Sequence, residues 1–223
     1  MSTAKDLFII ALRPGPHEPV GQGDLSLALA GAELIDLVGA GAVTVEGDRI
    51  VPGGARVPGD DRLLREAAAA VIAQEPYERI EDWLWRRGRD LAAGYQQVLE
   101  EDGELTRKRS GWSPFGPERV EPVGTAASRR AADRWAQGDP VLAELASAVG
   151  FDGGRTEDGG RSGDGGDDGA RTDEGRADDD DRGGDGAATS VLASVHDAVR
   201  ELEAVRQRRT IENAAFANLW RGP

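Results

Sequence analysis

The chain has 223 residues and a formal net charge of −14, with no Cys and only two His. These absences exclude a disulfide framework, a thiolate nucleophile and a Cys-ligated or three-His zinc site. Aromatic residues make up 5% of the chain, and Ala, Leu and Val supply most of the apolar mass, which favours helices over a β-sandwich. No apolar run approaches the ~20 residues that a membrane-spanning helix needs. We therefore expect a cytoplasmic protein whose membrane contact, if any, is peripheral.

The first third of the sequence predicts three helices and a hairpin. Residues 3–12 form a short helix before a Pro-Gly-Pro break, and residues 24–39 form a helix that is apolar nearly all round, which is typical of a central helix. Residues 43–51 have the pattern of a hairpin. A third helix begins at the Asp pair 60–61 and ends at Pro76. Its expected buried stripe comprises Leu63, Leu64, Ala67, Val71 and Ile72.

The middle of the chain predicts longer helices and a second hairpin. Residues 78–102 form the longest helical pattern, either as one helix or as two helices that divide at Gly88. Residues 105–123 form a second hairpin or an extended loop. Two helices follow over residues 125–135 and 139–149, and the second begins with an Asp-Pro pair that suits a helix N-terminus.

Residues 152–186 contain 12 Gly and 13 acidic residues and no large apolar side chain. Such a tract cannot offset its ordering entropy by burial, so it is predicted to be disordered. A helical spacing returns after it at Leu192, Val195, Val199, Leu202 and Val205, followed by Ile211, Phe216, Leu219 and Trp220.

These patterns predict a mostly α protein with a single helical domain and small β-hairpins. The domain comprises residues 1–151, and the disordered Gly/Asp-rich insertion comprises residues 152–186. C-terminal helices in residues 187–223 are expected to pack on the same domain.

Motifs of catalysis are absent from the sequence. It contains no G-x-S-x-G, phosphate-binding loop, dinucleotide fingerprint or H-E-x-x-H. His17 lies in a Pro/Gly-rich turn, and His196 lies beside Asp197 on a helical pattern, so both are expected at the surface. We expect no enzyme activity, no metal and no cofactor.

Basic residues gather in two places. Arg86, Arg87 and Arg89 lie within four residues, and a basic run at 107–109 precedes Trp112. Guanidinium groups match phosphate oxygens in bidentate geometry, and Trp is favoured at the lipid headgroup layer. The alternative interpretation is a solvated helix face beside a hairpin whose aromatic residues pack internally.

Several separate segments together resemble the Golgi phosphoprotein 3 family in a bacterial form. They are Leu7–Leu12, Gly23–Ile50, Glu81–Leu84, Glu101–Gly116 and Ala127–Pro140. The resemblance covers most of residues 5–150 and, more loosely, residues 187–221. It implies a mostly helical single domain. It also implies a peripheral membrane protein, because eukaryotic members recognise phosphatidylinositol 4-phosphate on Golgi membranes and recruit glycosyltransferase tails.

The resemblance also suggests which residues contact lipid. The family's lipid-contacting Trp falls near Gly21, and the Arg on the following helix falls near Ala30. Of two later Arg in the family, one falls close to Arg89 and the other near Ala92. The resemblance therefore implies little preference for phosphatidylinositol 4-phosphate over other anionic lipids. It further implies self-association through the hairpin at residues 105–123.

The leading hypothesis is a non-enzymatic adaptor that binds anionic phospholipid head groups at the cytoplasmic membrane face. The expected lipid-binding residues are Arg86, Arg87, Arg89, Arg107, Lys108, Arg109 and Trp112. One alternative is a protein–protein scaffold without lipid binding. Another is a winged-helix-like nucleic-acid binder, because helices followed by a basic hairpin also describe that fold. Binding to nucleic acid is the less favoured alternative, because the chain lacks a sustained basic face.

Overall fold

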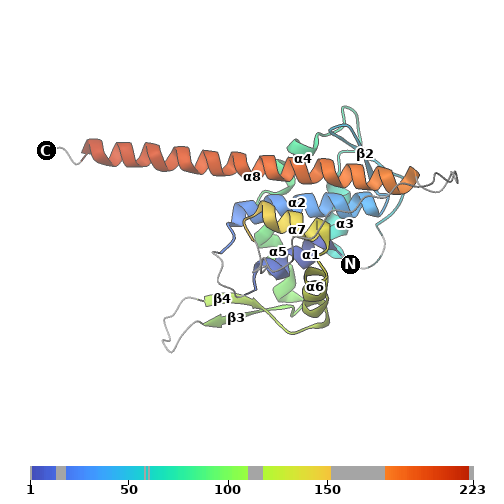
Figure 1. The fold of residues 1–223 in the computed structure, drawn as a ribbon, viewed down its shortest axis with the longest axis horizontal. Helices are drawn as coiled ribbons and strands as arrows, with labels where there is room; N and C mark the ends of the chain where they lie inside the picture. Colours follow the sequence, from blue (N-terminus) through green and yellow to red (C-terminus); the bar gives the residue numbers. More distant parts are fainter. Residues whose placement is uncertain are drawn as a thin grey trace, which may run out of the picture.

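The structure is a computed structural model that describes residues 2–13, 19–57, 59, 61–109, 118–151 and 179–220. These residues form eight helices and two antiparallel hairpins (Figure 1). The helices are α1 (Thr3–Ala11), α2 (Gln22–Gly39), α3 (Arg62–Ala70), α4 (Ile80–Arg87), α5 (Leu91–Glu101), α6 (Ala126–Ala136), α7 (Pro140–Ala148) and α8 (Asp179–Trp220). The hairpins are β1 (Val43–Glu46) with β2 (Arg49–Pro52), and β3 (Leu105–Arg109) with β4 (Glu118–Pro122). The predicted fold class is confirmed.

Most of the predicted insertion, residues 152–178, lies outside the described residues. Helix α8 begins at Asp179, so residues 179–186 belong to this helix rather than to the insertion. The helical spacing predicted after the insertion is therefore part of one helix of 42 residues.

Helix α2 lies at the centre of the helical body, where α1, α4, α5, α7 and α8 all contact it. Its side chains are buried on nearly every face, as the all-round apolar sequence predicts. Trp83 of α4 is fully buried, and its indole Nε1 donates to the carbonyl oxygen of Ala30 at 3.0 Å. Because this bond satisfies the polar atom of the indole, the whole ring can pack in the core.

The N-terminal half of α8 packs on α2 (Figure 1). A β-carbon built on Gly31 of α2 would lie 2.3 Å from the Cγ2 atom of Val195, so any larger residue would force the helices apart. The buried residues of this half are Ala187, Val191, Val195 and Ala198. The predicted stripe contained Val195 but also Leu192 and Val199, which are only half-buried. The stripe is displaced because small residues, rather than the largest ones, face α2.

The long helical pattern of residues 78–102 is divided into α4 and α5 at Gly88, as the sequence indicates. A β-carbon on Gly88 would lie 2.5 Å from the carbonyl oxygen of Leu84, which favours Gly at this C-cap. Asp90 follows with φ 56° and is the one non-Gly residue with positive φ in the described chain. Asp tolerates the left-handed region better than most residues do. The break leaves Arg89 at the junction of the two helices.

The third helix is shorter than predicted. Asp61 caps α3 by accepting from the N–H of Leu64 at 3.2 Å, but α3 ends at Ala70 rather than near Pro76. Val71 has an extended backbone with ψ 132° and ends the helix. Ile72 is therefore not part of the buried stripe, and 41% of its surface is exposed. Leu63, Leu64 and Ala67 of the predicted stripe are buried. Val71 is half-buried.

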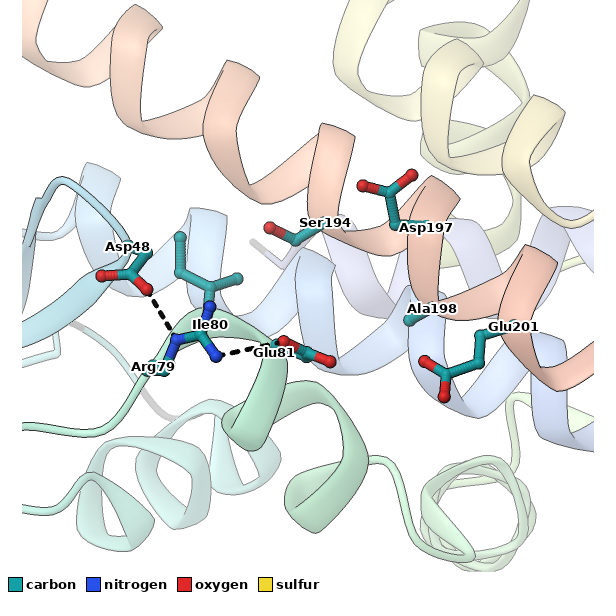
Figure 2. Close-up of a pocket in the computed structure, with 8 residues that line it drawn as sticks. All are labelled: Asp48, Arg79, Ile80, Glu81, Ser194, Asp197, Ala198 and Glu201. Carbon is teal, nitrogen blue, oxygen red and sulfur yellow. Dashed lines mark hydrogen bonds and ion pairs between the residues drawn. The ribbon is translucent and has the colours of Figure 1, made fainter.

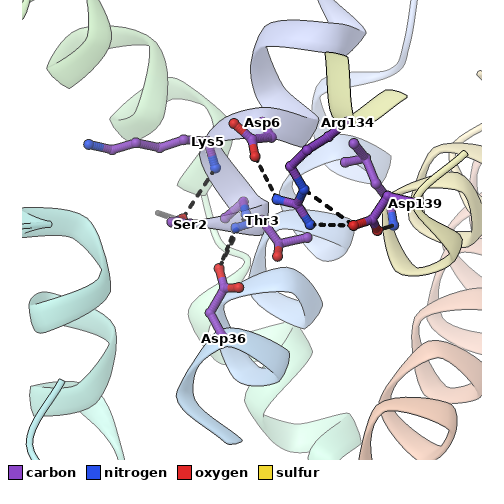
Figure 3. Close-up of polar contacts among 9 residues, drawn as sticks. Ser2, Thr3, Lys5, Asp6, Asp36, Arg134 and Asp139 are labelled. Atoms are coloured by element: carbon purple, nitrogen blue, oxygen red, sulfur yellow. Dashed lines mark hydrogen bonds and ion pairs between the residues drawn. The ribbon is translucent and has the colours of Figure 1, made fainter. Parts of the chain in front are cut away.

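Two carboxylates, of which Asp6 is buried and Asp36 is half-buried, join the N-terminal helix to the rest of the body (Figure 3). Asp36 of α2 accepts from the backbone N–H of Thr3 at 2.7 Å. Asp6 of α1 accepts from Arg134 of α6 at 2.6 Å, and the same guanidinium donates to Asp139 at 2.8 Å. Asp139 is also the N-cap of α7, as the sequence predicts. One arginine therefore holds α1, α6 and α7 together.

The carboxyl group of Asp36 should make stability depend on pH. Burial raises its pKa from 3.8 to about 6, so the folded state binds the proton more tightly than the unfolded state between these values. Stability should therefore fall as pH rises from about 4 to 6, by on the order of 2–3 kcal/mol in total. Asp36→Asn keeps a hydrogen-bond acceptor but does not titrate. Urea unfolding of both proteins from pH 4 to 7.5 measures the difference, and parallel pH curves would contradict this assignment.

The close packing of α2 on α8 predicts opposite effects of the same substitution at two glycines. Gly31→Ala should destabilise the protein by about 1–2 kcal/mol, because its β-carbon collides with Val195. Gly94→Ala should stabilise it by about 0.5–1 kcal/mol, because Gly94 lies in α5 and a β-carbon added there would meet no atom within 4 Å. Unfolding midpoints in urea compare the two variants. Stabilisation by both substitutions would show that α8 does not pack this closely on α2.

Candidate functional site

The three arginines predicted at the end of α4 have different surroundings. Arg86 forms a bidentate pair with Glu78, in which Nε lies 2.6 Å from Oε1 and Nη2 lies 2.7 Å from Oε2. Its Nη2 also donates to the carbonyl oxygen of Ala70 at 3.0 Å. The guanidinium lies 5.3 Å from the centroid of the Trp83 ring, within the range of a cation–π contact. Arg86 therefore fastens the end of α3 to α4.

Arg87 pairs with a carboxylate in the core. Its Nε and Nη2 donate to the two oxygens of Glu33 at 2.7 and 2.9 Å. The Glu33 side chain has no exposed surface, and the hydroxyl of Tyr95 donates to it at 3.0 Å. Burial raises the pKa of Glu33, while the hydrogen bonds from Arg87 act in the opposite direction. This cluster joins α2, α4 and α5 through one carboxylate.

Arg89 differs from its two neighbours. Its side chain is exposed, and it makes no hydrogen bond or ion pair with any residue that the structure describes. It lines a pocket of about 400 Å³ between α2, the α4–α5 junction and α8. The lining residues are Gln22, Gly23, Ser26, Leu27, Trp85, Gly88, Arg89, Asp90 and Leu202.

The lining of the Arg89 pocket combines apolar side chains with polar and charged groups. Trp85 and Leu202 are half-buried and supply apolar surface. Its lining includes Gln22 and Gly23 in the first turn of α2, a helix whose N-cap is Gly21 and which no side chain caps. Unpaired N–H groups at such a terminus carry partial positive charge. Asp90 contributes one negative charge to the lining.

An ion pair between α8 and α2 lies next to the Arg89 pocket. Arg206 of α8 lies 2.6 Å from Asp24 of α2, and its guanidinium comes close to Gly23. Arg206 is thus a second cation near the pocket, although its charge is already matched by Asp24. The set of groups suits an anion of moderate size, because a free guanidinium and a helix N-terminus face one cavity.

The basic hairpin is only partly described. Arg107 pairs with Glu100 at 2.9 Å, and Lys108 pairs with Glu121 at 2.9 Å. The side chain of Arg109 and the whole of Trp112 lie outside the described residues. Neither Arg107 nor Lys108 is among the residues that line the Arg89 pocket.

A second pocket, of about 200 Å³, lies between the β1–β2 turn, the start of α4 and α8 (Figure 2). Its lining contains four carboxylates, Asp48, Glu81, Asp197 and Glu201, and one arginine, Arg79. Figure 2 shows Arg79 paired with Asp48 at 2.6 Å and with Glu81 at 3.4 Å. The hydrogen bond from Arg79 lowers the pKa of Asp48. The excess of negative charge makes this pocket a poor match for phosphate groups.

A third pocket lies between α3 and the loop after β2. It has a volume of about 520 Å³ and is lined mostly by Ala, Val, Pro and Gly, with Arg56 and Arg65 among its lining residues. Both arginines are exposed, and neither pairs with a described residue. Arg65 therefore offers a matched comparison for Arg89 on a different part of the surface.

Sequence reasoning found Arg89 but missed the residues that surround it. Trp85 lies four positions before Arg89. In a helical pattern this spacing places two residues on the same helix face, so the sequence did contain a signal that links Trp85 to Arg89. Gln22 and Leu202 carried no such signal, because they reach the pocket from helices far away in the sequence.

Two features are absent from the described part of the chain. None of its helices combines the length and apolarity needed to cross a membrane. Within the same residues, no group of three or more His, Cys, Asp or Glu side chains is arranged to hold a metal ion.

Comparison with known proteins gives two results. The sequence model of a family described as Golgi phosphoprotein 3 (GPP34) matches residues 4–202. A CinA-like protein of Deinococcus radiodurans is 35% identical over 98 residues, which are 44% of this chain and 23% of that relative. The matched part thus spans less than a quarter of the relative's length, whereas the family match covers all the helices that form the body.

Replacing Arg87 should test whether it is structural. Arg87→Met should destabilise the protein by about 3–5 kcal/mol, because Glu33 would be left buried without a counter-charge. The double variant Glu33→Gln with Arg87→Met should recover most of this loss, since no buried charge remains. Free energies of unfolding from urea titrations measure both effects.

The matched control for this experiment is Arg89→Met, which removes an exposed arginine two residues away. Its free energy of unfolding should change by less than about 0.5 kcal/mol. Equal losses for Arg87→Met and Arg89→Met would contradict the distinction between a buried pair and a free surface cation.

Proposed function

Because the chain belongs to the Golgi phosphoprotein 3 family, we propose that it is a non-enzymatic adaptor that binds anionic membrane surfaces peripherally. The Arg89 pocket receives a phosphorylated or acidic lipid head group. The observation that supports this proposal is an exposed guanidinium without a partner among the described residues, at a cavity that also meets the uncapped N-terminus of α2.

The physical argument starts from the free charge of Arg89. Arg86 and Arg87 already donate to carboxylates, so binding a phosphate through them would first break a strong pair. Binding a phosphate through Arg89 breaks no ion pair with a described residue. Its planar fork of N–H donors matches two phosphate oxygens, and the N–H groups of the first turn of α2 add favourable partial charge.

The pocket also suits the position of a head group at a membrane. Trp85 and Leu202 give it apolar walls, which suit the C–H face of an inositol ring or the glycerol backbone of a lipid. A single free Arg beside Asp90 offers one strong phosphate contact rather than several. We therefore propose recognition of negative charge at the bilayer surface, with weak preference among anionic lipids.

The basic hairpin takes a supporting part in this proposal. Arg107 and Lys108 are exposed, but each is paired with a carboxylate and adds no net charge near the bilayer, so their contribution is secondary to that of Arg89. Trp112 as an interfacial anchor and self-association through residues 105–123 stay predictions. The adaptor role also requires a protein partner, which the family resemblance suggests and which is part of this proposal.

The alternative of nucleic-acid binding receives less support. Arg107 pairs with Glu100 and Lys108 pairs with Glu121, so these two described cations of the hairpin are not free for nucleic-acid phosphates. The net charge of −14 opposes long-range attraction to any anionic surface, and nucleic-acid binding depends on such attraction along an extended basic face. A scaffold without lipid binding remains the alternative that the experiment below separates.

Co-sedimentation with vesicles tests the proposal. Vesicles of phosphatidylcholine with phosphatidylserine or with phosphatidylinositol 4-phosphate, at equal total charge, should bind the protein, and pure phosphatidylcholine should not. Arg89→Met should weaken binding at least about fivefold, because one basic side chain at an anionic surface contributes on the order of 1 kcal/mol. Binding should also weaken with added salt.

The control is Arg65→Met, which removes an equally exposed arginine without a described partner from another face. It should leave binding within about twofold. Equal losses for both variants would mean that overall charge, not the Arg89 pocket, controls binding. A lack of binding to either anionic vesicle would reject the lipid role and favour the scaffold.

A further inference from the structure

The pocket between α3 and the loop after β2, here called the Arg65 pocket, takes no part in the proposed function. Its volume of about 520 Å³ lies within the range of pockets that hold small molecules, roughly 300–1,000 Å³. Most of its lining is apolar, and Pro52, Val57 and Val71 are the largest apolar residues in it. A lining of this kind with a few polar groups is typical of a ligand site.

Backbone hydrogen bonds hold the loop that forms one side of the Arg65 pocket. The N–H of Gly53 donates to the carbonyl oxygen of Ala42 at 2.8 Å, and the N–H of Ala55 donates to that of Gly41 at 3.2 Å. A β-carbon built on Gly53 would lie 2.3 Å from the carbonyl oxygen of Gly41, so the close approach of these two segments requires Gly. This side of the pocket is therefore formed without a ligand.

Helix α3 forms the other side of the Arg65 pocket. Arg65, Ala68 and Ala69 line the pocket, and their spacing of three and four residues places them on one face of the helix. Leu63 and Ala67 lie on another face and are buried in the core. Because the helix is anchored in this way and its alanines are small, it leaves space for a ligand beside a fixed wall.

The charge of the Arg65 pocket is opposite in sign to that of the whole protein. Its charged lining residues are Arg56 and Arg65, and no carboxylate is among the described residues that line it. Both arginines are exposed, and neither pairs with a described residue. The chain has 41 acidic and 27 basic residues besides His, so this pocket attracts an anion against the overall charge. The Arg89 pocket differs, because its lining includes Asp90.

An apolar surface continues from the pocket past the end of α3. Ile72 lies between Val71 and Ala73, which both line the pocket. Among the described residues, two large hydrophobic side chains are exposed, and Ile72 is one of them. Exposed apolar surface next to an apolar pocket marks an interaction site. A ligand with an apolar part longer than the pocket can therefore extend over Ile72.

From this combination of shape and charge, we propose that the Arg65 pocket binds a small amphipathic anion, namely an alkyl chain that carries one carboxylate group. The chain lies against the apolar lining and extends toward Ile72. The carboxylate accepts hydrogen bonds from the guanidinium groups of Arg56 and Arg65, whose geometry suits it.

This proposal does not rest on the lipid proposal, because the two pockets share no lining residue. The ligands also differ. The Arg89 pocket receives a head group whose chains remain in the bilayer, whereas the Arg65 pocket takes the chain of a free amphiphile. Arg89→Met and Arg65→Met therefore serve as controls for each other in the two experiments.

Calorimetric titration of the full-length chain with decanoate, below the concentration at which decanoate forms micelles, tests the proposal. Decanoate should bind at one saturable site. Acetate lacks the chain and should bind at least about tenfold more weakly, because it buries little apolar surface. Decyltrimethylammonium has the chain with the opposite charge and should also bind at least about tenfold more weakly, because it cannot accept from guanidinium groups.

Substitutions locate the site. Arg65→Met and Arg56→Met should each weaken decanoate binding at least about fivefold, because each removes a charge-assisted hydrogen bond, and Arg89→Met should not. Ala69→Trp should abolish binding, because its ring occupies the pocket. Ala69 is exposed, so the fold should tolerate this change, and thermal unfolding checks that it does. Ala93→Trp is the matched control, because Ala93 is exposed on α5 and is not among the lining residues.

Three results would overturn the proposal. One is the absence of saturable decanoate binding. Another is equal binding of decanoate and decyltrimethylammonium, which would indicate adsorption of any alkyl chain. The third is decanoate binding that folded Ala69→Trp retains, since the ligand would then lie elsewhere. None of these results changes the expected binding of vesicles through Arg89.

Discussion

The arrangement of the central helices depends on one buried carboxylate. Glu33 lies in the middle of α2 with no exposed side-chain surface, where an ion without a partner would be too costly to keep. Arg87 from the end of α4 and Tyr95 from α5 both donate to it. Because each donor comes from a different helix, satisfying this single charge fixes the positions of α4 and α5 on α2.

The same constraint decides which arginine is available for a ligand. Arg87 must point into the core to reach Glu33, and Arg86 on the neighbouring face reaches Glu78 and the end of α3. The chain then breaks at Gly88 and passes through the left-handed Asp90. Arg89 consequently lies at the junction of α4 and α5 with an exposed side chain, at a pocket between the start of α2 and the middle of α8.

Helix α8 serves the body and the surface in different ways along its length. Near Gly31 it packs so closely on α2 that small residues and Val form the contact. At Leu202 it supplies a wall of the Arg89 pocket, and Arg206 anchors it to Asp24. Beyond that point the described residues from Gln207 to Asn213 are all exposed. One amphipathic pattern therefore forms the core, limits the pocket and offers an exposed face.

The sequence by itself determined the fold class, most helix boundaries and the family resemblance. Local signals are sufficient for these features, because apolar spacing, the caps Asp61 and Asp139 and the break at Gly88 act within a few residues. The sequence also pointed to the cluster of Arg86, Arg87 and Arg89. It could not distinguish among them, since all three are arginines within one turn. Only the tertiary structure decided this, because the carboxylates that occupy Arg86 and Arg87 and the helix ends that surround Arg89 come from distant parts of the chain.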